Sequence, residues 1–185
     1  MVHVEQPWSA VVLAGGAGRR LGGVDKPGLI IRGRTLLDRV LAALPGAHEI
    51  VIVGPRRETE AKVRWTREPT PGSGPLAALA AGLDLITTDR VVLLAADLPQ
   101  ITPTTITRLR QAVTHTGAVL TDSDHHPQWL LSAWPTDLLR RALPADSANA
   151  SLRGTLTPLS PVRVDDMDGS ARDIDVPSDL DAFPE

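Results

Sequence analysis

Apolar residues gather in short runs along the chain, separated by glycine, proline or charged residues. Continuous runs are typical of strands that are buried on both faces of a parallel sheet. Such runs cover 8–13, 50–53 and 91–94. Runs with the spacing of one helix face predict helices at 35–44, 76–86, 104–115 and 135–143. This alternation predicts an α/β fold with a mostly parallel sheet.

The second half of the chain continues the pattern with shorter elements. Strands are predicted at 118–120, 129–134 and 162–164, and a short helix at 148–156. The segment 56–67 is highly charged, and a solvated helix with an edge strand is its simplest interpretation. Neither an internal repeat nor a low-complexity linker interrupts the sequence. We therefore expect one domain over residues 1–185.

Composition excludes several classes of protein. The 185 residues contain no cysteine, which rules out disulfides and cysteine zinc sites. The net charge of -3 argues against general nucleic-acid binding. The first residues, MVHVEQPW, have no basic region followed by an apolar region, so we expect no leader, and no apolar run approaches the roughly 18 residues that a membrane-spanning helix needs. We expect a cytoplasmic protein without membrane contact.

Residues 11–26, VVLAGGAGRRLGGVDK, carry the most distinctive pattern. The first predicted strand ends there, and a loop with five glycines begins. These are Gly15, Gly16, Gly18, Gly22 and Gly23. Glycines let a backbone turn tightly and present N–H groups to an anion, and Arg19, Arg20 and Lys26 add positive charge. The expected ligand is a polyphosphate, because a purely structural turn would explain the glycines but not the cations.

Two familiar glycine loops do not fit this stretch. A Walker A loop ends in Gly-Lys-Ser/Thr, whereas Lys26 lies between Asp25 and Pro27. A dinucleotide-binding loop needs a glycine where Leu21 stands, and arginines within its turn would be unusual. A nicotinamide-dependent reductase is therefore disfavoured.

Asp97 follows the predicted strand 91–94. Ligands of open α/β sheets lie beyond the carboxyl ends of the strands, so Asp97 should face the same crevice as the glycine loop. A carboxylate in this place is a natural Mg²⁺ ligand. The alternative role, a helix cap, is weakened because Thr102-Pro103 already supplies a cap for the next helix.

The glycine loop closely resembles the signature of the MobA-like nucleotidyltransferases. Leu13-Ala14-Gly15-Gly16, Arg20-Leu21-Gly22 and Asp25-Lys26 match it in order and spacing. Further segments that resemble motifs of this family are Gly74–Ala77, Asp97–Pro99 and Asp173–Leu180. The resemblance implies a Rossmann-like three-layer α/β/α sandwich of the nucleotide-diphospho-sugar transferase type.

The same resemblance implies roles for individual residues. Glu68 is the acid nearest to the place where many relatives carry an aspartate. The implied nucleotide-binding residues are Leu13, Ala14, Gly15, Gly16, Gly18, Lys26, Glu68, Gly74, Pro75, Leu76 and Asp97. The implied catalytic residues are Arg20, Lys26 and Asp97, the metal ligands Asp97 and Asp175, and the acceptor-binding residues His126 and Asp173.

The activity implied by the resemblance is transfer of GMP from GTP to the phosphate of molybdopterin, with release of pyrophosphate. It implies Mg²⁺, with Mn²⁺ as an alternative, and a monomer or weak oligomer that contacts proteins of molybdenum cofactor biosynthesis or molybdoenzymes transiently. A phosphate acceptor is already anionic near neutral pH and needs no general base. Relatives that use CTP, or a sugar, polyol or phospholactate acceptor, remain alternatives, as does a non-catalytic nucleotide-binding module.

Asp122, Asp124, His125 and His126 form a polar cluster before the strand at 129–134. A structural zinc site is disfavoured, because adjacent histidines seldom bind one ion and no third ligand stands at a helical spacing. The family resemblance instead suggests that His126-Pro127 lines the acceptor pocket. A solvated loop is the alternative.

Overall fold

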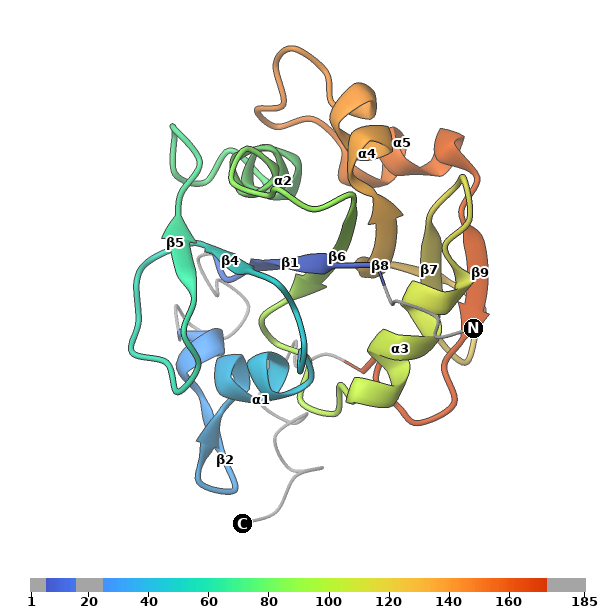
Figure 1. Ribbon diagram of the computed structural model, residues 1–185. Helices are drawn as coiled ribbons and strands as arrows, with labels where there is room; N and C mark the ends of the chain where they lie inside the picture. Colours follow the sequence, from blue (N-terminus) through green and yellow to red (C-terminus); the bar gives the residue numbers. More distant parts are fainter. Residues whose placement is uncertain (1–5, 16–24, 173–185) are drawn as a thin grey trace.

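The computed structural model describes residues 6–15 and 25–172. A seven-stranded sheet with the order β5-β4-β1-β6-β8-β7-β9 forms its centre. Figure 1 shows this sheet between two helical layers, with α2, α4 and α5 on one face and α1 and α3 on the other. The predicted three-layer arrangement is confirmed.

The elements follow one another in the order strand, helix, strand over most of the chain. The strands of the large sheet are β1 (Trp8–Leu13), β4 (Ile50–Val53), β5 (Arg64–Thr66), β6 (Arg90–Ala95), β7 (Ala118–Thr121), β8 (Pro127–Pro135) and β9 (Val162–Asp165). A small hairpin is formed by β2 (Ile30–Ile31) and β3 (Arg34–Thr35). The α-helices are α1 (Leu36–Ala42), α2 (Pro75–Leu83), α3 (Pro103–Ala112), α4 (Thr136–Ala142) and α5 (Leu152–Leu156), and η2 (Lys26–Gly28) and η3 (Thr157–Leu159) are 3₁₀ turns.

Most pairs of neighbouring strands are parallel. β1 pairs in parallel with β4 and β6, β4 with β5, and β7 with β9. β8 is antiparallel to both of its neighbours, β6 and β7. The sheet is therefore mostly parallel, as predicted, and the antiparallel β8 brings the β7–β8 hairpin to the edge where β6 ends.

The predicted strands and helices agree with the structure except at a few places. No helix forms within 56–63, although the predicted edge strand does form as β5. The run has charge but no apolar stripe that a helix could bury. The predicted helix at 148–156 begins only at Leu152, because the Ser151 hydroxyl accepts a hydrogen bond from Gly154 N at 2.9 Å and caps α5 there.

Apolar side chains fill both faces of the central strands. All six residues of β1 are buried, and the middle four of β6 are buried as well. Helix α2 packs closely on this surface, because a Cβ at Gly82 would lie 2.5 Å from Val11 Cγ1. On the same face Trp134 of β8 is completely buried and donates from its indole to Ser132.

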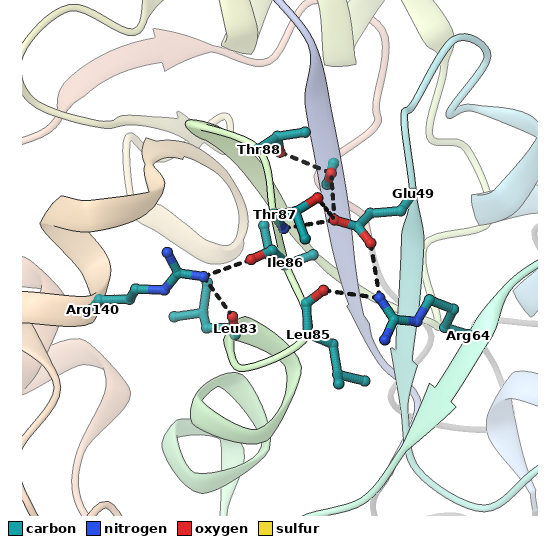
Figure 2. Close-up of polar contacts among 9 residues, drawn as sticks. Glu49, Arg64, Leu83, Leu85, Ile86, Thr87, Thr88 and Arg140 are labelled. Atoms are coloured by element: carbon teal, nitrogen blue, oxygen red, sulfur yellow. Dashed lines mark hydrogen bonds and ion pairs between the residues drawn. The ribbon is translucent and has the colours of Figure 1, made fainter.

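A polar network fastens the sheet at the edge opposite the carboxyl ends of β1 and β6 (Figure 2). The Glu49 carboxylate accepts hydrogen bonds from Thr87 N at 2.7 Å and from Arg64 Nη1 at 3.0 Å. Partial burial acts to raise the pKa of Glu49, but the donors on Thr87 and Arg64 outweigh it and lower this pKa. Arg140 of α4 donates to the carbonyls of Leu83 and Ile86. These bonds join β4, β5, α4 and the end of α2.

Within the described ranges no helix is long and apolar enough to cross a membrane.

Candidate active site

Lys26 and Asp97 meet beyond the carboxyl ends of two adjacent strands. β1 and β6 are parallel neighbours, and their last residues, Leu13 and Ala95, are paired. Beyond these ends, β1 leads into Gly15 and β6 leads into Asp97. Asp97 therefore lies on the same side of the sheet as the start of the glycine loop, as predicted from the sequence. Lys26 Nζ lies 3.7 Å from Asp97 Oδ2, and the two side chains are 16% and 23% exposed. A cation and a carboxylate, both partly buried, are therefore held together at this edge of the sheet.

Arg57 makes a second ion pair beside the first. Its Nε donates to both oxygens of Asp25, at 3.1 and 2.9 Å, and Nη2 also donates to this carboxylate. Nη1 donates to the carbonyl oxygens of Ala14 and Pro55, at 3.2 and 2.8 Å. The hydrogen bonds from Arg57 lower the pKa of Asp25 despite the opposing effect of partial burial.

Sequence reasoning missed Arg57, because the run 56–67 was assigned to a solvated surface. A signal was present: Arg57 follows β4 closely, at the edge where β1 and β6 end. The rule that selected Asp97 as the residue beyond a parallel strand would have selected this arginine too.

Gly54 explains how β4 comes so close to the start of the glycine loop. A Cβ at Gly54 would lie 2.7 Å from both Ala14 C and Ala14 O, and 2.8 Å from Gly15 N. Its φ of +151° is also a conformation that residues with side chains rarely adopt. Glycine is therefore required at this position.

The segment before α2 lies at the same edge of the sheet. Gly74, with a φ of +93°, precedes Pro75 at the start of α2. Glu68 accepts a hydrogen bond from Gly72 N at 2.9 Å and so closes the turn between β5 and α2. Leu76 is fully buried, so its side chain belongs to the core, and any contact with a ligand would involve its backbone. The side chains of Leu13 and Ala14 are buried as well, so any contact of these residues with a ligand would also involve their backbone.

The β7–β8 loop gathers three groups able to bind a metal. One ligand atom each from Asp122, Asp124 and His126 lies within 4.8 Å of the others. From the sequence a structural zinc site was disfavoured, because the histidines are adjacent and no third ligand stands at a helical spacing, but a tight turn brings the three groups together. Asp122 accepts hydrogen bonds from the backbone of His126 and Asp124, and these bonds lower its pKa. The side chain of His126 is 76% exposed.

A second acidic loop fastens the end of β9 to the start of α3. Asp168 accepts hydrogen bonds from Thr102 at 2.7 Å, from Thr105 at 2.8 Å and from Ser170 at 2.6 Å. Burial acts to raise the pKa of Asp168, but these donors outweigh it and lower this pKa to about 2. Thr102 also caps α3 by accepting from Thr105 N.

We expect acid to weaken the fold through Asp168. Because its pKa is lower in the folded chain than in the unfolded chain, its ionised form stabilises the fold at neutral pH, and this contribution is lost as the pH falls from about 4 to about 2. Urea unfolding should show that Asp168→Asn lowers the free energy of unfolding by about 1 kcal/mol at pH 7, a value that already allows for solvent screening. Near pH 2 the substitution should lower it by less. Glu58→Gln, which changes an exposed acid, is the control. Equal losses for Asp168→Asn at both pH values would contradict this expectation.

Some predicted site residues lie outside the described ranges. These are Gly16, Gly18, Arg20, Asp173 and Asp175. Their roles stay predictions.

Comparison with known proteins identifies the family. The model of the MobA-like NTP transferase domain matches residues 10–162. The chain belongs to the MobA-like NTP transferase family. This match includes most of β1 and all of β6, and with them the glycine loop and Asp97.

Relatives with guanylyltransferase names match most of the chain. A molybdenum cofactor guanylyltransferase of Bradyrhizobium sp. (strain ORS 278) is 33% identical over 160 residues, which is 78% of this chain and 76% of that protein. One from Nitrobacter hamburgensis is 34% identical over 157 residues, covering 76% and 74%.

Solved structures share the fold of this MobA-like chain. A nucleotidyl transferase from Methanothermobacter thermautotroptrophicus matches with a TM-score of 0.76 and 24% identity, over 97% of both chains. The molybdopterin-guanine dinucleotide biosynthesis protein A from Archaeoglobus fulgidus matches with a TM-score of 0.70 and 22% identity, over 95% of this chain and 96% of that one. The predicted nucleotidyltransferase fold is confirmed.

Proposed function

We propose that this MobA-like chain transfers GMP from GTP to the phosphate of molybdopterin and releases pyrophosphate. The observation that carries the proposal is the Lys26–Asp97 pair, 3.7 Å apart at the carboxyl ends of β1 and β6. A member of a nucleotidyltransferase family needs a cation for phosphate and a carboxylate for a metal in this crevice. The guanylyltransferase names of the relatives support guanine as the base and molybdopterin as the acceptor.

The donor set at this edge suits Mg²⁺. Magnesium in phosphate-transfer sites is commonly held by one or two carboxylates together with substrate phosphates. Asp97 is a partly buried carboxylate at this edge, and Lys26 Nζ lies 3.7 Å from it. Asp97 would hold the ion, with Asp175 as the predicted second ligand. The ion would supply Lewis-acid stabilisation of the phosphate charge.

The residues of the chain would contribute to catalysis by positioning the substrates and by neutralising phosphate charge. Lys26 neutralises charge on the phosphates, and the backbone of the glycine loop binds the triphosphate, with Arg20 as a predicted second cation. The acceptor phosphate already carries the attacking oxygen in anionic form, so alignment with the α-phosphate replaces a general base. His126, on the β7–β8 hairpin next to β6, is the predicted contact of the acceptor.

The test is a substrate matrix with purified protein. Each of the four nucleoside triphosphates is mixed with Mg²⁺ and with molybdopterin, a sugar phosphate, a polyol phosphate or phospholactate, and pyrophosphate release is measured. We expect turnover with GTP and molybdopterin, with the dinucleotide product seen by mass spectrometry. Turnover with CTP alone would overturn the guanylyl assignment. GTP binding without turnover on any acceptor would instead indicate a nucleotide-binding module.

A further inference from the structure

We propose that Arg57 is a positioning residue that clamps both ends of the glycine loop and thereby places Lys26 against Asp97. The inference rests on the proposed function, which it deepens by adding a residue outside the predicted site. It follows from the contacts of one guanidinium group with two segments that flank residues 16–24.

The first anchor is on the strand side of the loop. Arg57 Nη1 donates to Ala14 O at 3.2 Å and to Pro55 O at 2.8 Å. Ala14 N in turn donates to Val53 O at 2.8 Å. The point where β1 leads into the loop is therefore held by two bonds, one to Val53 of β4 and one to Arg57 just beyond β4.

The second anchor is on the helix side of the loop. The fork of Arg57 binds Asp25 through Nε and Nη2, and the side chain of Arg57 is only 17% exposed. Asp25 is also the residue before Lys26 and the cap position of η2. A planar fork with several donors fixes orientation as well as distance, which a single ammonium cannot do. Holding Asp25 in this way fixes the backbone that carries Lys26.

The clamp also settles which carboxylate Lys26 faces. Asp25 is a neighbour of Lys26 in sequence and would compete with Asp97 for its ammonium group. Because Arg57 neutralises Asp25, Lys26 is left at 3.7 Å from Asp97 Oδ2. Without Arg57, the uncompensated carboxylate would stand beside the place proposed for the phosphates and repel them.

Gly28 gives independent support for the placement of Asp25. A Cβ at Gly28 would lie 2.6 Å from Asp25 Oδ2, so an alanine there would push the carboxylate out of the clamp. The φ of Gly28 does not lie in the region reserved for glycine, so backbone strain would not confuse the result.

The kinetic test uses Arg57→Gln, Asp25→Asn, their double variant and Gly28→Ala in the full chain, with Arg56→Gln, at the exposed neighbouring position, as matched control. A displaced reacting geometry commonly costs between about tenfold and a hundredfold. We expect Arg57→Gln to lower kcat/KM for GTP by that factor. The double variant should be no worse than Arg57→Gln alone, because both changes break one interaction. Arg57→Lys should recover only part of the loss, and Gly28→Ala, which leaves the Asp25 carboxylate charged but displaced from Arg57, should lower kcat/KM in the same direction as Arg57→Gln.

A second measurement follows Lys26 directly and needs no acceptor. The chain has only two lysines, Lys26 and Lys62. Acetylation with a small excess of acetic anhydride, followed by peptide mass spectrometry, gives the rate at Lys26 relative to exposed Lys62. We expect this ratio to rise at least threefold in Arg57→Gln and to stay unchanged in Arg56→Gln, with melting temperatures of both variants close to that of the parent.

Two outcomes would overturn the clamp. One is an unchanged Lys26-to-Lys62 ratio in Arg57→Gln, and the other is a kcat/KM within twofold of the parent. A parent protein that transfers no GMP would overturn the proposed function instead, while the acetylation ratio would still report on the clamp.

Discussion

Asp97→Asn should reduce pyrophosphate release from GTP by about a thousandfold, which corresponds to about 4 kcal/mol in the transition state. The substitution keeps the size of the side chain and one oxygen but removes the negative charge that the proposed Mg²⁺ needs. It also removes the partner that lies 3.7 Å from Lys26 Nζ. The rate is measured with saturating Mg²⁺, with GTP and molybdopterin as substrates.

The fold should tolerate this change. Asp97 and Lys26 are 23% and 16% exposed and lie 3.7 Å apart, so we expect the loss of this ion pair to lower the free energy of unfolding by about 1–2 kcal/mol, as measured by urea unfolding. Asp84→Asn, at the exposed end of α2, is the matched control and should leave the rate unaltered. If Asp97→Asn kept more than a third of the parent rate, the proposed metal ligand would be wrong.

The central strands could be predicted because their continuous apolar runs fit only the interior of the sheet, where both faces are buried. β1, β4 and β6 are buried on both faces, and a strand in such a place needs continuous apolar residues. Parallel pairing then puts their carboxyl ends at one edge of the sheet. This is why two positions 71 residues apart, Lys26 and Asp97, could be expected together from the sequence.

The clamp could not be found in the same way. Arg57 is 32 residues from Asp25 and 43 from Ala14, and only the position of β4 beside β1 brings them into contact. The local sequence around Arg57 shows mainly charge, and charge alone predicts a solvated surface. The helix expected within 56–67 did not form, because the run has no apolar stripe that a helix could bury, whereas the expected edge strand did form as β5.

The β7–β8 loop shows a different limit of sequence reasoning. Adjacent histidines and the lack of a third ligand at a helical spacing argued against a zinc site at Asp122, Asp124 and His126, but a turn can bring together side chains that no regular spacing relates. Asp122 does so by accepting two backbone hydrogen bonds from within the loop. Its carboxylate therefore already has a structural use, and its proximity to His126 needs no metal to explain it.

Gly54→Ala should be the most destabilising single methyl addition near the site, at about 3 kcal/mol, or a fall of about 6–12 °C in Tm. The new Cβ would meet backbone atoms of Ala14 and Gly15 at 2.7 to 2.8 Å, and backbone held in a sheet cannot move aside cheaply. Separation of β4 from β1 would also carry Arg57 away from Ala14 O, so the affinity for GTP should fall as well. Both are measured, by calorimetric unfolding and by isothermal titration.

Gly46→Ala is the control that separates backbone strain from steric clash as causes of the expected loss of stability in Gly54→Ala. Gly46 has a φ of +80°, but nothing lies within 4 Å of a Cβ built there, so its substitution reports backbone strain without a steric clash. We expect it to cost about 1 kcal/mol and to leave GTP affinity unchanged. If Gly54→Ala lowered Tm and GTP affinity no more than Gly46→Ala does, the close approach of β4 to the glycine loop would contribute nothing to stability or binding. In that case, the proposal that Arg57, which follows β4, positions Lys26 would also lose its physical basis.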